Sequence, residues 1–338
     1  MPVFQFYGYM IRDLWLYHFA RAFILCSLVP QSSCTTHRLH NTGFSNPRKV
    51  IFSYSDIHNF WKAYDYSAGK ADVVQQKIYY SEYFGKGSIG LRDFVADQDL
   101  NKKEFIKNID LAWGYLDVAH QNTLHVSNYQ HAILSAMYKL KKIYPRARFP
   151  NIYYIVAGFI SGGTVSKRAI MIGTEFWSLP ETVDALKFPF NWMKNSIRTP
   201  DNIPFTAAHE LLHFQQNRRE FPVSLLGKCL AEGSADFVGE LISGRVNNKY
   251  LYEYAAGRGK LLWLEFKKDM RTNDLSKWIY NLGLIKDRPP DLGYYIGYKI
   301  CESYYNRMRI KKKAIRDIIE MNDFEKFLVM SQYDESFK

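Results

Sequence analysis

The most constraining feature of this sequence is a short segment, Thr206 to Gln216, in which His209, Glu210 and His213 form the pattern H-E-x-x-H. The segment has the apolar spacing of a helix, and Pro204 stands near its start, where a missing N–H costs little. Residues four apart lie on the same face of a helix, so both imidazoles can face one ion while Glu210 lies beside them. The segment therefore predicts a helix that carries part of a metal site.

A second helical segment downstream supplies Glu232 and, one turn later, Asp236. Glu232 follows His213 by eighteen residues, not counting either end, and the turn at residues 217–222 lets the second helix fold back onto the first. Two imidazoles and one carboxylate leave a fourth coordination position open, which is the catalytic arrangement of zinc. We therefore expect a single Zn²⁺ ion held by His209, His213 and Glu232. Asp236 is expected to accept the second N–H of a ligand histidine rather than to bind the ion.

Residues 1–34 resemble a signal peptide or lipoprotein leader. Two arginines precede an apolar stretch, residues 22–29, which is too short to span a bilayer. The residues before Cys34 are similar to a bacterial lipoprotein cleavage signal, although Gln31 stands where an aliphatic residue is usual. An ordinary amphipathic helix is the alternative interpretation. The leader predicts export to the periplasm or cell envelope, and two outcomes are open: cleavage near Cys34, or membrane attachment through a lipidated Cys34.

Three further segments follow the leader. Residues 35–48 are predicted to be a linker, residues 49–144 a helical region, and residues 145–338 the region that carries the metal site. Residues 151–160 and 169–177 are rich in β-branched and aromatic side chains, and a Gly-Gly turn separates them, so they predict an antiparallel strand pair. The predicted fold is α+β and mainly helical, with a small antiparallel sheet beside the HExxH helix. Apolar spacing in the helical region predicts the helices Asp56–Tyr64, Ala71–Tyr80, Lys102–His120 and Ser127–Ile143.

Composition is that of a folded protein, because 47% of the 338 residues are apolar and 23% are charged. The net charge of +12 would suit binding to nucleic acid or to an anionic membrane. The basic residues are dispersed, and the densest cluster, Arg307 to Arg316, is interpreted as a solvated helix face. Without a recognition motif we expect no nucleic-acid partner. The cysteines lack the C-x-x-C spacing of a structural zinc site, and the pairing of Cys229 with Cys301 is left open.

The zinc motifs carry a family resemblance. The pattern His209-Glu-x-x-His213, eighteen residues, then Glu232-Gly-x-Ala resembles the gluzincin metallopeptidases: the spacing matches their aminopeptidase branch, and Glu232 followed by Asp236 is like their thermolysin branch. More closely, the chain resembles a bacterial family of zinc-dependent proteases related to a gliding-motility lipoprotein. This likeness covers roughly residue 50 to the end. Besides the zinc motifs it rests on Gly87-Ser-x-Gly-Leu-x-Asp-Phe94, Ser161-Gly-Gly-Thr164 and Arg288-Pro-x-Asp-Leu-Gly-Tyr-Tyr-Ile-Gly-Tyr-Lys299.

The resemblance implies hydrolysis of peptide bonds, with Glu210 as the general base and a downstream tyrosine that steadies the oxyanion. Tyr294, Tyr295 and Tyr298 follow Glu232 at a separation along the sequence similar to that in the gluzincins. We prefer Tyr298 for this role, although each of the three could instead be a core residue. Gly293 and Gly297 flank two of these tyrosines and would let another backbone or a substrate approach closely.

The resemblance also suggests substrate contacts. In gluzincins the strand before the active helix lies along the cleft and pairs with the substrate backbone, so we expect residues 169–177 to do so. Glu175 on that strand would bind a substrate amine, or would be an ordinary solvated position. Tyr295 and Arg288 are further candidates for substrate contact, although Arg288 could equally tie down the turn at Pro289 and Pro290.

Two hypotheses about function follow. The first is a zinc metallopeptidase that acts on a peptide or protein substrate. The second is a non-catalytic envelope lipoprotein that uses a peptidase-like fold as a binding or assembly platform. A platform needs no general base, so the complete set of His209, Glu210, His213 and Glu232 favours the enzyme. The plainest alternative for these residues is a pair of surface helices with ordinary charges.

Overall fold

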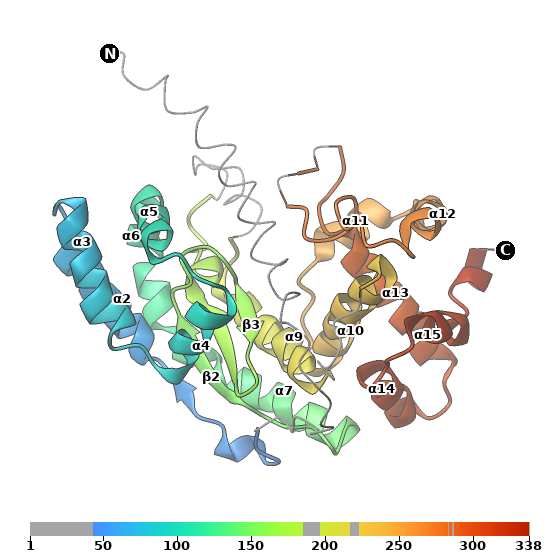
Figure 1. Ribbon diagram of the computed structural model, residues 1–338. Coiled ribbons are helices and arrows are strands. Elements are labelled where there is room, and N and C mark those ends of the chain that lie inside the picture. Colours follow the sequence, from blue (N-terminus) through green and yellow to red (C-terminus); the bar gives the residue numbers. More distant parts are fainter. Residues whose placement is uncertain (1–42, 185–196, 217–222, 283, 286, 338) are drawn as a thin grey trace, which may run out of the picture.

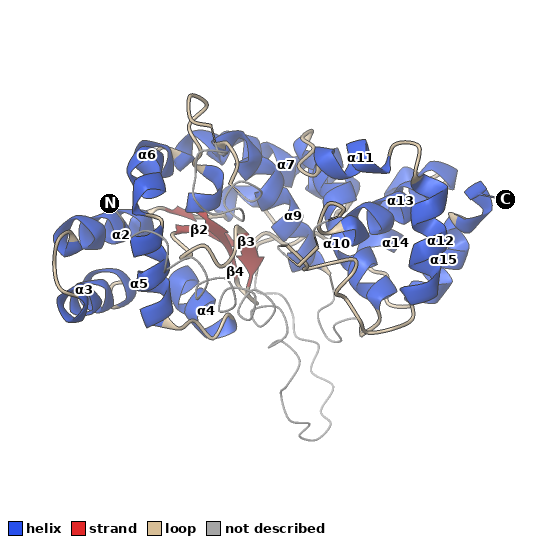
Figure 2. Cartoon of the chain, turned by 90° about the horizontal axis from the view of Figure 1, so that it is seen from above, coloured by secondary structure: helices blue, strands red, loops and turns tan. Residues whose placement is uncertain are grey.

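A computed structural model describes residues 43–184, 197–216, 223–282, 284–285 and 287–337 of the chain. These residues form a mainly helical α+β fold with one small sheet, which confirms the predicted class. In Figures 1 and 2 the sheet and the first helices lie on one side of the central helix α9 (Ile203–Gln215), and the C-terminal helices lie on the other.

The helices predicted for the N-terminal region are all present. The predicted helix over residues 102–120 is divided in two, because Ala112 leaves the helical conformation with φ −101° and ψ 10°. A further helix that the apolar spacing did not predict begins after Ser88, whose side chain accepts a hydrogen bond from the N–H of Leu91. The helices of this region are α2 (Ser55–Ser67), α3 (Asp72–Ile78), α4 (Ile89–Asp97), α5 (Lys102–Leu111), α6 (Trp113–Leu124) and α7 (Gln130–Ile143).

The sheet is mixed rather than antiparallel. Its strands are β1 (Phe52–Ser53), β2 (Asn151–Ile155), β3 (Gly163–Val165) and β4 (Ala169–Gly173). They lie in the order β1-β2-β4-β3, and β2 runs parallel to both β1 and β4. Only β3 and β4 are antiparallel neighbours. The prediction that residues 151–160 and 169–177 form an antiparallel pair is therefore wrong.

Two local turns explain the difference. After β2 the chain changes direction at Gly158 and Phe159, which have positive φ values of 66° and 59°. It forms β3 and then turns at Ser166, whose N–H donates to the carbonyl of Ala169 (2.9 Å) and whose hydroxyl accepts from the N–H of Ala169 (3.1 Å). This second turn makes β3 and β4 a hairpin, so β4 is inserted between β2 and β3. The glycine pair expected to form the hairpin turn leads into β3 instead.

Helices α10 (Leu225–Ser243) and α13 (Leu292–Arg307) pack very closely because glycines lie at their contact. A Cβ on Gly233 would lie 2.2 Å from the backbone carbon of Gly297, and a Cβ on Gly297 would lie 1.8 Å from the carbonyl oxygen of Cys229. A Cβ on Gly293 would lie 2.5 Å from the sulfur of Cys229. Backbones approach this closely only where no side chain intervenes. Gly293 and Gly297 were expected to allow the close approach of either another backbone or a substrate. The structure supports the first of these roles, because backbone atoms of other segments lie against both glycines.

The remaining C-terminal helices surround this pair. They are α11 (Lys249–Ala255), α12 (Gly259–Asp269), α14 (Lys311–Ile319) and α15 (Phe324–Ser331). Cys229 and Cys301 are buried free thiols, so they do not pair. In the parts of the chain described above, each helix is too short or too polar to cross a membrane.

The leader, with Gln31 and Cys34, lies outside the described residues, as does most of the predicted linker. The described end of the linker is packed against the fold. Phe44 exchanges two backbone hydrogen bonds of 2.8 Å with Phe149, and the side chain of Asn46 accepts from the N–H of Arg48. Residues before the predicted start at residue 49 are therefore already part of the fold.

Candidate metal centre

Helix α9 carries the HExxH pattern through the interior of the protein. It contacts the strands β3 and β4 and the helices α7 and α10, and most of its residues are buried. A helix that is apolar nearly all round is expected in such a position. His209 and His213 are only partly buried, and their ring centroids are 4.6 Å apart. The two imidazoles therefore lie together at an accessible place on a buried helix.

Helix α10 brings the carboxylates to these imidazoles. It begins after Ser224, whose hydroxyl accepts from the N–H of Gly227, and it ends at Gly244 in the left-handed conformation with φ 75°. Glu232 and Asp236 are both buried, one turn apart, where α10 packs against α9. The predicted fold-back of the second helix is confirmed.

Three donor atoms converge on one point. The Nε2 atoms of His209 and His213 are 2.9 Å apart, and Oε2 of Glu232 lies 3.2 Å from the first and 3.1 Å from the second. Zinc bonds of about 2.0–2.1 Å in a tetrahedron place neighbouring ligand atoms about 3.3 Å apart. The three side chains form a group that could hold a metal ion, and their spacing fits zinc with little adjustment.

Asp236 holds His209 in the required tautomer. Its Oδ1 lies 2.8 Å from Nδ1 of His209, and its Oδ2 accepts from Nδ2 of Asn248 at 2.7 Å. A carboxylate oxygen accepts hydrogen bonds, so Nδ1 of His209 is the donor of this bond and Nε2 is the ring nitrogen that faces the site. The structure thus gives Asp236 the place predicted for it and adds Asn248, which no sequence pattern indicated.

Gln216 performs the same task for His213. Its Nε2 donates to the carbonyl of Ala231 (3.0 Å) and to the hydroxyl of Ser234 (2.8 Å), so its Oε1 is the atom that faces Nδ1 of His213 at 2.8 Å. An amide oxygen can only accept, which again places the proton on Nδ1. Sequence reasoning missed Gln216. Its position three residues after His213, directly after the end of α9, was the available signal.

The charges of the centre are strongly coupled. Burial alone would lower the pKa of His209, but hydrogen bonds to Asp236 and Glu232 raise that pKa well above its ordinary value. Burial alone would raise the pKa of Glu232, but His213 and His209 lower it well below its ordinary value. The carboxylates that favour a proton on an imidazole would also favour a cation placed between the donors.

Glu210 is buried beside the donors and in contact with the sheet. A Cβ on Gly163 would lie 2.8 Å from Oε1 of Glu210 and 2.8 Å from Cγ2 of Thr206, so only glycine allows β3 to lie this close to α9. Strand β3 is the edge of the sheet on this side, whereas β4 has neighbours on both sides. The expectation that residues 169–177 offer an edge to a substrate is therefore corrected: β3 occupies that place.

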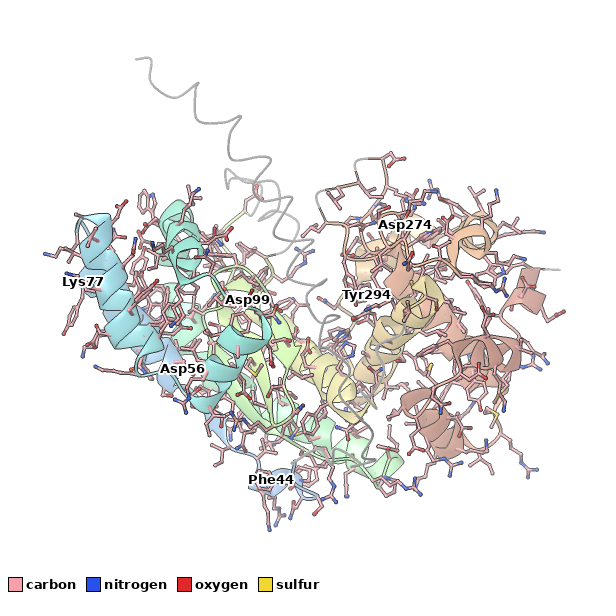
Figure 3. The ribbon with its side chains drawn as sticks, in the orientation of Figure 1. Phe44, Asp56, Lys77, Asp99, Asp274 and Tyr294 are labelled. Carbon is pink, nitrogen blue, oxygen red and sulfur yellow. The ribbon has the colours of Figure 1, made fainter. Side chains whose placement is uncertain are left out.

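Two tyrosines approach the centre, and neither is the preferred Tyr298. The ring of Tyr294, labelled in Figure 3, lies nearly parallel to that of His209, with centroids 6.3 Å apart and an angle of 21°. The hydroxyl of Tyr280 donates to Oε1 of Glu232 at 2.6 Å. Tyr298 packs edge-on against Phe237, and its hydroxyl is hydrogen-bonded to Glu240. One helical turn along α13 is enough to take Tyr298 away from the donors.

Glu175 is not a surface residue that could bind a substrate amine. It lies in the short helix η5 (Thr174–Trp177) and is fully buried. Its Oε1 accepts from the N–H groups of Ala157 (2.8 Å) and Phe159 (2.9 Å), while its Oε2 has no hydrogen-bond partner. Burial raises the pKa of Glu175 to about 7. Its contacts shape the turn between β2 and β3.

Arg288 and Tyr295 also lie apart from the donors. Arg288 pairs with Glu265 (2.9 Å), donates to the carbonyl of Lys277 (2.7 Å) and covers the ring of Trp278, which supports its structural alternative. Tyr295 lines a separate cavity of about 590 Å³ between α13 and the C-terminal residues. Neither residue contacts the metal-ligating group.

The chain matches no family model, no curated protein and no solved structure in the three comparisons.

Proposed function

We propose that this chain is a zinc-dependent metallopeptidase of the gluzincin type that hydrolyses peptide bonds in a peptide or protein substrate. The observation that carries the proposal is the convergence of His209, His213 and Glu232 within 2.9–3.2 Å beside the buried carboxylate of Glu210. Structural zinc usually has four protein ligands, whereas catalytic zinc keeps one position open. Three donors with an acid next to them support the catalytic role.

The residues of the centre divide the chemistry among them. A bound zinc ion would lower the pKa of water and polarise the substrate carbonyl. Glu210 would accept a proton from the attacking water and pass it to the leaving amine. Tyr294 replaces Tyr298 as the proposed donor to the developing oxyanion, because its ring lies beside that of His209 and the hydroxyl of Tyr280 is already bonded to Glu232.

The proposed path of the substrate follows β3. An extended peptide can pair with an edge strand through backbone hydrogen bonds, and β3 is the edge strand next to α9. Gly163 removes the side chain that would separate this edge from Glu210. A peptide on β3 would therefore present its carbonyl groups near the general base.

The test is the substitution Glu210→Gln. It keeps the size of the side chain and all three donors, so the purified variant should retain as much zinc as the wild type. Loss of the general base should reduce cleavage of a diverse peptide library by about 10²–10⁴-fold. Metal analysis and mass-spectrometric detection of products give the two measurements.

The matched control is Glu253→Gln, an equivalent change at an exposed position of α11 whose contact is a 3.6 Å ion pair with Lys249. Both zinc content and cleavage should stay unchanged in this variant. A wild type that carries zinc but cleaves nothing across the library would contradict the proposal and favour a binding platform. Equal cleavage by Glu210→Gln and wild type would exclude Glu210 as the base.

A further inference from the structure

The two oxygens of Glu232 have different partners. Oε2 faces the imidazoles, 3.2 Å from Nε2 of His209 and 3.1 Å from Nε2 of His213. Oε1 accepts a hydrogen bond of 2.6 Å from the hydroxyl of Tyr280. A short hydrogen bond to an ionised carboxylate is among the stronger kinds. The bond therefore fixes which oxygen of Glu232 is turned toward the other donors.

Tyr280 reaches Glu232 from a strained backbone conformation. Its φ is 55°, in the left-handed region that aromatic residues rarely adopt. Such a conformation persists only where surrounding contacts impose it. The neighbouring Asn281 is buried, and its side chain accepts from the N–H of Asp291 (2.8 Å) and donates to the carbonyl of Ser276 (3.0 Å). These bonds hold the segment that presents the hydroxyl.

The ring of Tyr280 is also held. It lies edge-on to the ring of Tyr294, with centroids 6.5 Å apart and an angle of 85°. The N–H of Gly293 donates to the carbonyl of Trp278 at 2.7 Å, which ties the start of α13 to the same segment. The position of the hydroxyl is therefore set by the fold and not by Glu232 alone.

We infer that Tyr280 is a positioning residue that keeps Glu232 a one-oxygen ligand, by occupying Oε1 and leaving Oε2 to the metal. This inference rests on the proposed zinc centre. A carboxylate with both oxygens free can bind a metal through either one or both. Two-oxygen binding would fill the position that a catalytic centre keeps open. Tyr280 would thus preserve the open position without touching the metal or the substrate.

The test uses Tyr280→Phe, which removes the hydroxyl and keeps the ring. Co²⁺ replaces zinc as the probe, because its visible absorption is strong in four-coordinate sites and weak at higher coordination numbers. The wild type should give the strong bands, and Tyr280→Phe should lose intensity as Glu232 binds through both oxygens. Zinc affinity, measured by competition with a chelator, should fall by about 10-fold or more, as is usual when a hydrogen-bond partner of a metal ligand is removed.

Two controls separate this role from a general structural one. Tyr294→Phe should keep the Co²⁺ spectrum of the wild type, because the hydroxyl bonded to Glu232 is that of Tyr280. The ring of Tyr294, which lies beside His209, is kept in this variant. Tyr295→Phe, whose ring faces the separate cavity, should also keep it. If Tyr280→Phe does not fold, the carboxylate stretching bands in the infrared difference spectrum of the zinc-loaded wild type report the number of bound oxygens directly.

The outcomes distinguish this inference from the proposed function. A wild type that binds neither Zn²⁺ nor Co²⁺ would overturn both. If the wild type is four-coordinate and the Co²⁺ spectrum of Tyr280→Phe is identical to that of the wild type, the inference about Tyr280 is overturned and the proposed metal centre is not. Infrared bands of a two-oxygen carboxylate in the wild type would do the same.

Discussion

Replacing Gly297 by alanine is expected to destabilise the protein and to impair the metal centre together. A Cβ at this position would lie 1.8 Å from the carbonyl oxygen of Cys229 and 2.5 Å from its carbonyl carbon. Both are backbone atoms of α10, so no side-chain rotation can relieve the clash. Real Cβ contacts essentially never fall below 3.0 Å, so α13 must move away from α10 by roughly 1.2 Å.

The magnitude follows from two opposing terms. Forcing an extra methyl group into a packed core typically costs about 1–3 kcal/mol, and a backbone-to-backbone contact belongs at the upper end of that range. Alanine in place of glycine stabilises a helix by up to about 1 kcal/mol. The net loss in the free energy of unfolding is therefore about 2 kcal/mol, which lowers the melting temperature of a chain of 338 residues by about 3 °C. Tyr294 moves with α13, and a displacement of about 1 Å at a reacting centre can reduce the rate by about 10²-fold.

The assay is thermal unfolding followed by circular dichroism, with cleavage measured at a temperature where both proteins are folded. Gly239→Ala is the matched control, because its Cβ would meet its nearest neighbour, the backbone nitrogen of His209, at an ordinary 3.4 Å. That variant should be as stable as the wild type, or more stable by up to about 1 kcal/mol. Equal melting temperatures for Gly297→Ala and the wild type would refute the close contact of α10 and α13.

Two further predictions concern polar residues of the interior. Gln216→Leu leaves Nδ1–H of His213 without its acceptor, so zinc affinity measured by chelator competition should fall by about 10–100-fold. An unchanged zinc affinity would show that Gln216 does not orient His213. Burial raises the pKa of Glu175 from 4.5 to about 7, so the folded state is favoured most below pH 4.5 and loses about 3 kcal/mol of stability as the pH rises through 7. Glu175→Gln should remove that loss, and its melting temperature should fall less than that of the wild type between pH 5 and pH 8; identical pH dependence would contradict the assignment.

The donors of the centre could be found from sequence because helical periodicity fixes them locally. His209 and His213 share a face of α9, and Glu232 and Asp236 share a face of α10. The short connection between the helices left antiparallel packing as the simplest arrangement. No long-range information was needed to bring these four side chains together.

The choice among the tyrosines depended on information that the sequence does not contain. Tyr294 and Tyr298 lie on the same helix, and which of them meets the donors depends on how α13 is rotated and how closely it packs on α10. The contact of Gly233 with Gly297 fixes both quantities. Those glycines were visible in the sequence, but their partner helix was not.

The sheet was mispredicted for a related reason. Strand β3 has only three residues, Gly163–Val165, which are too few to show the alternating pattern of a strand. Its place at the edge results from pairing with β4 and from contact with α9. Short strands of this kind are formed by their surroundings rather than by local preference.

The geometry of the metal centre is set by residues outside the two helices that carry its donors. Gln216 follows α9, Asn248 precedes α11, and Tyr280 precedes α13. Gln216 and Tyr280 make hydrogen bonds of 2.8 Å and 2.6 Å to the donor side chains of His213 and Glu232. Asn248 makes a hydrogen bond of 2.7 Å to Asp236, which in turn is bonded to the donor His209. Side chains held in this way lose their rotamer freedom when the chain folds, so little of that entropy remains to be lost when a cation binds. A pattern search along α9 and α10 therefore finds the donors, whereas the hydrogen bonds that orient them come from loop residues that only the fold brings near.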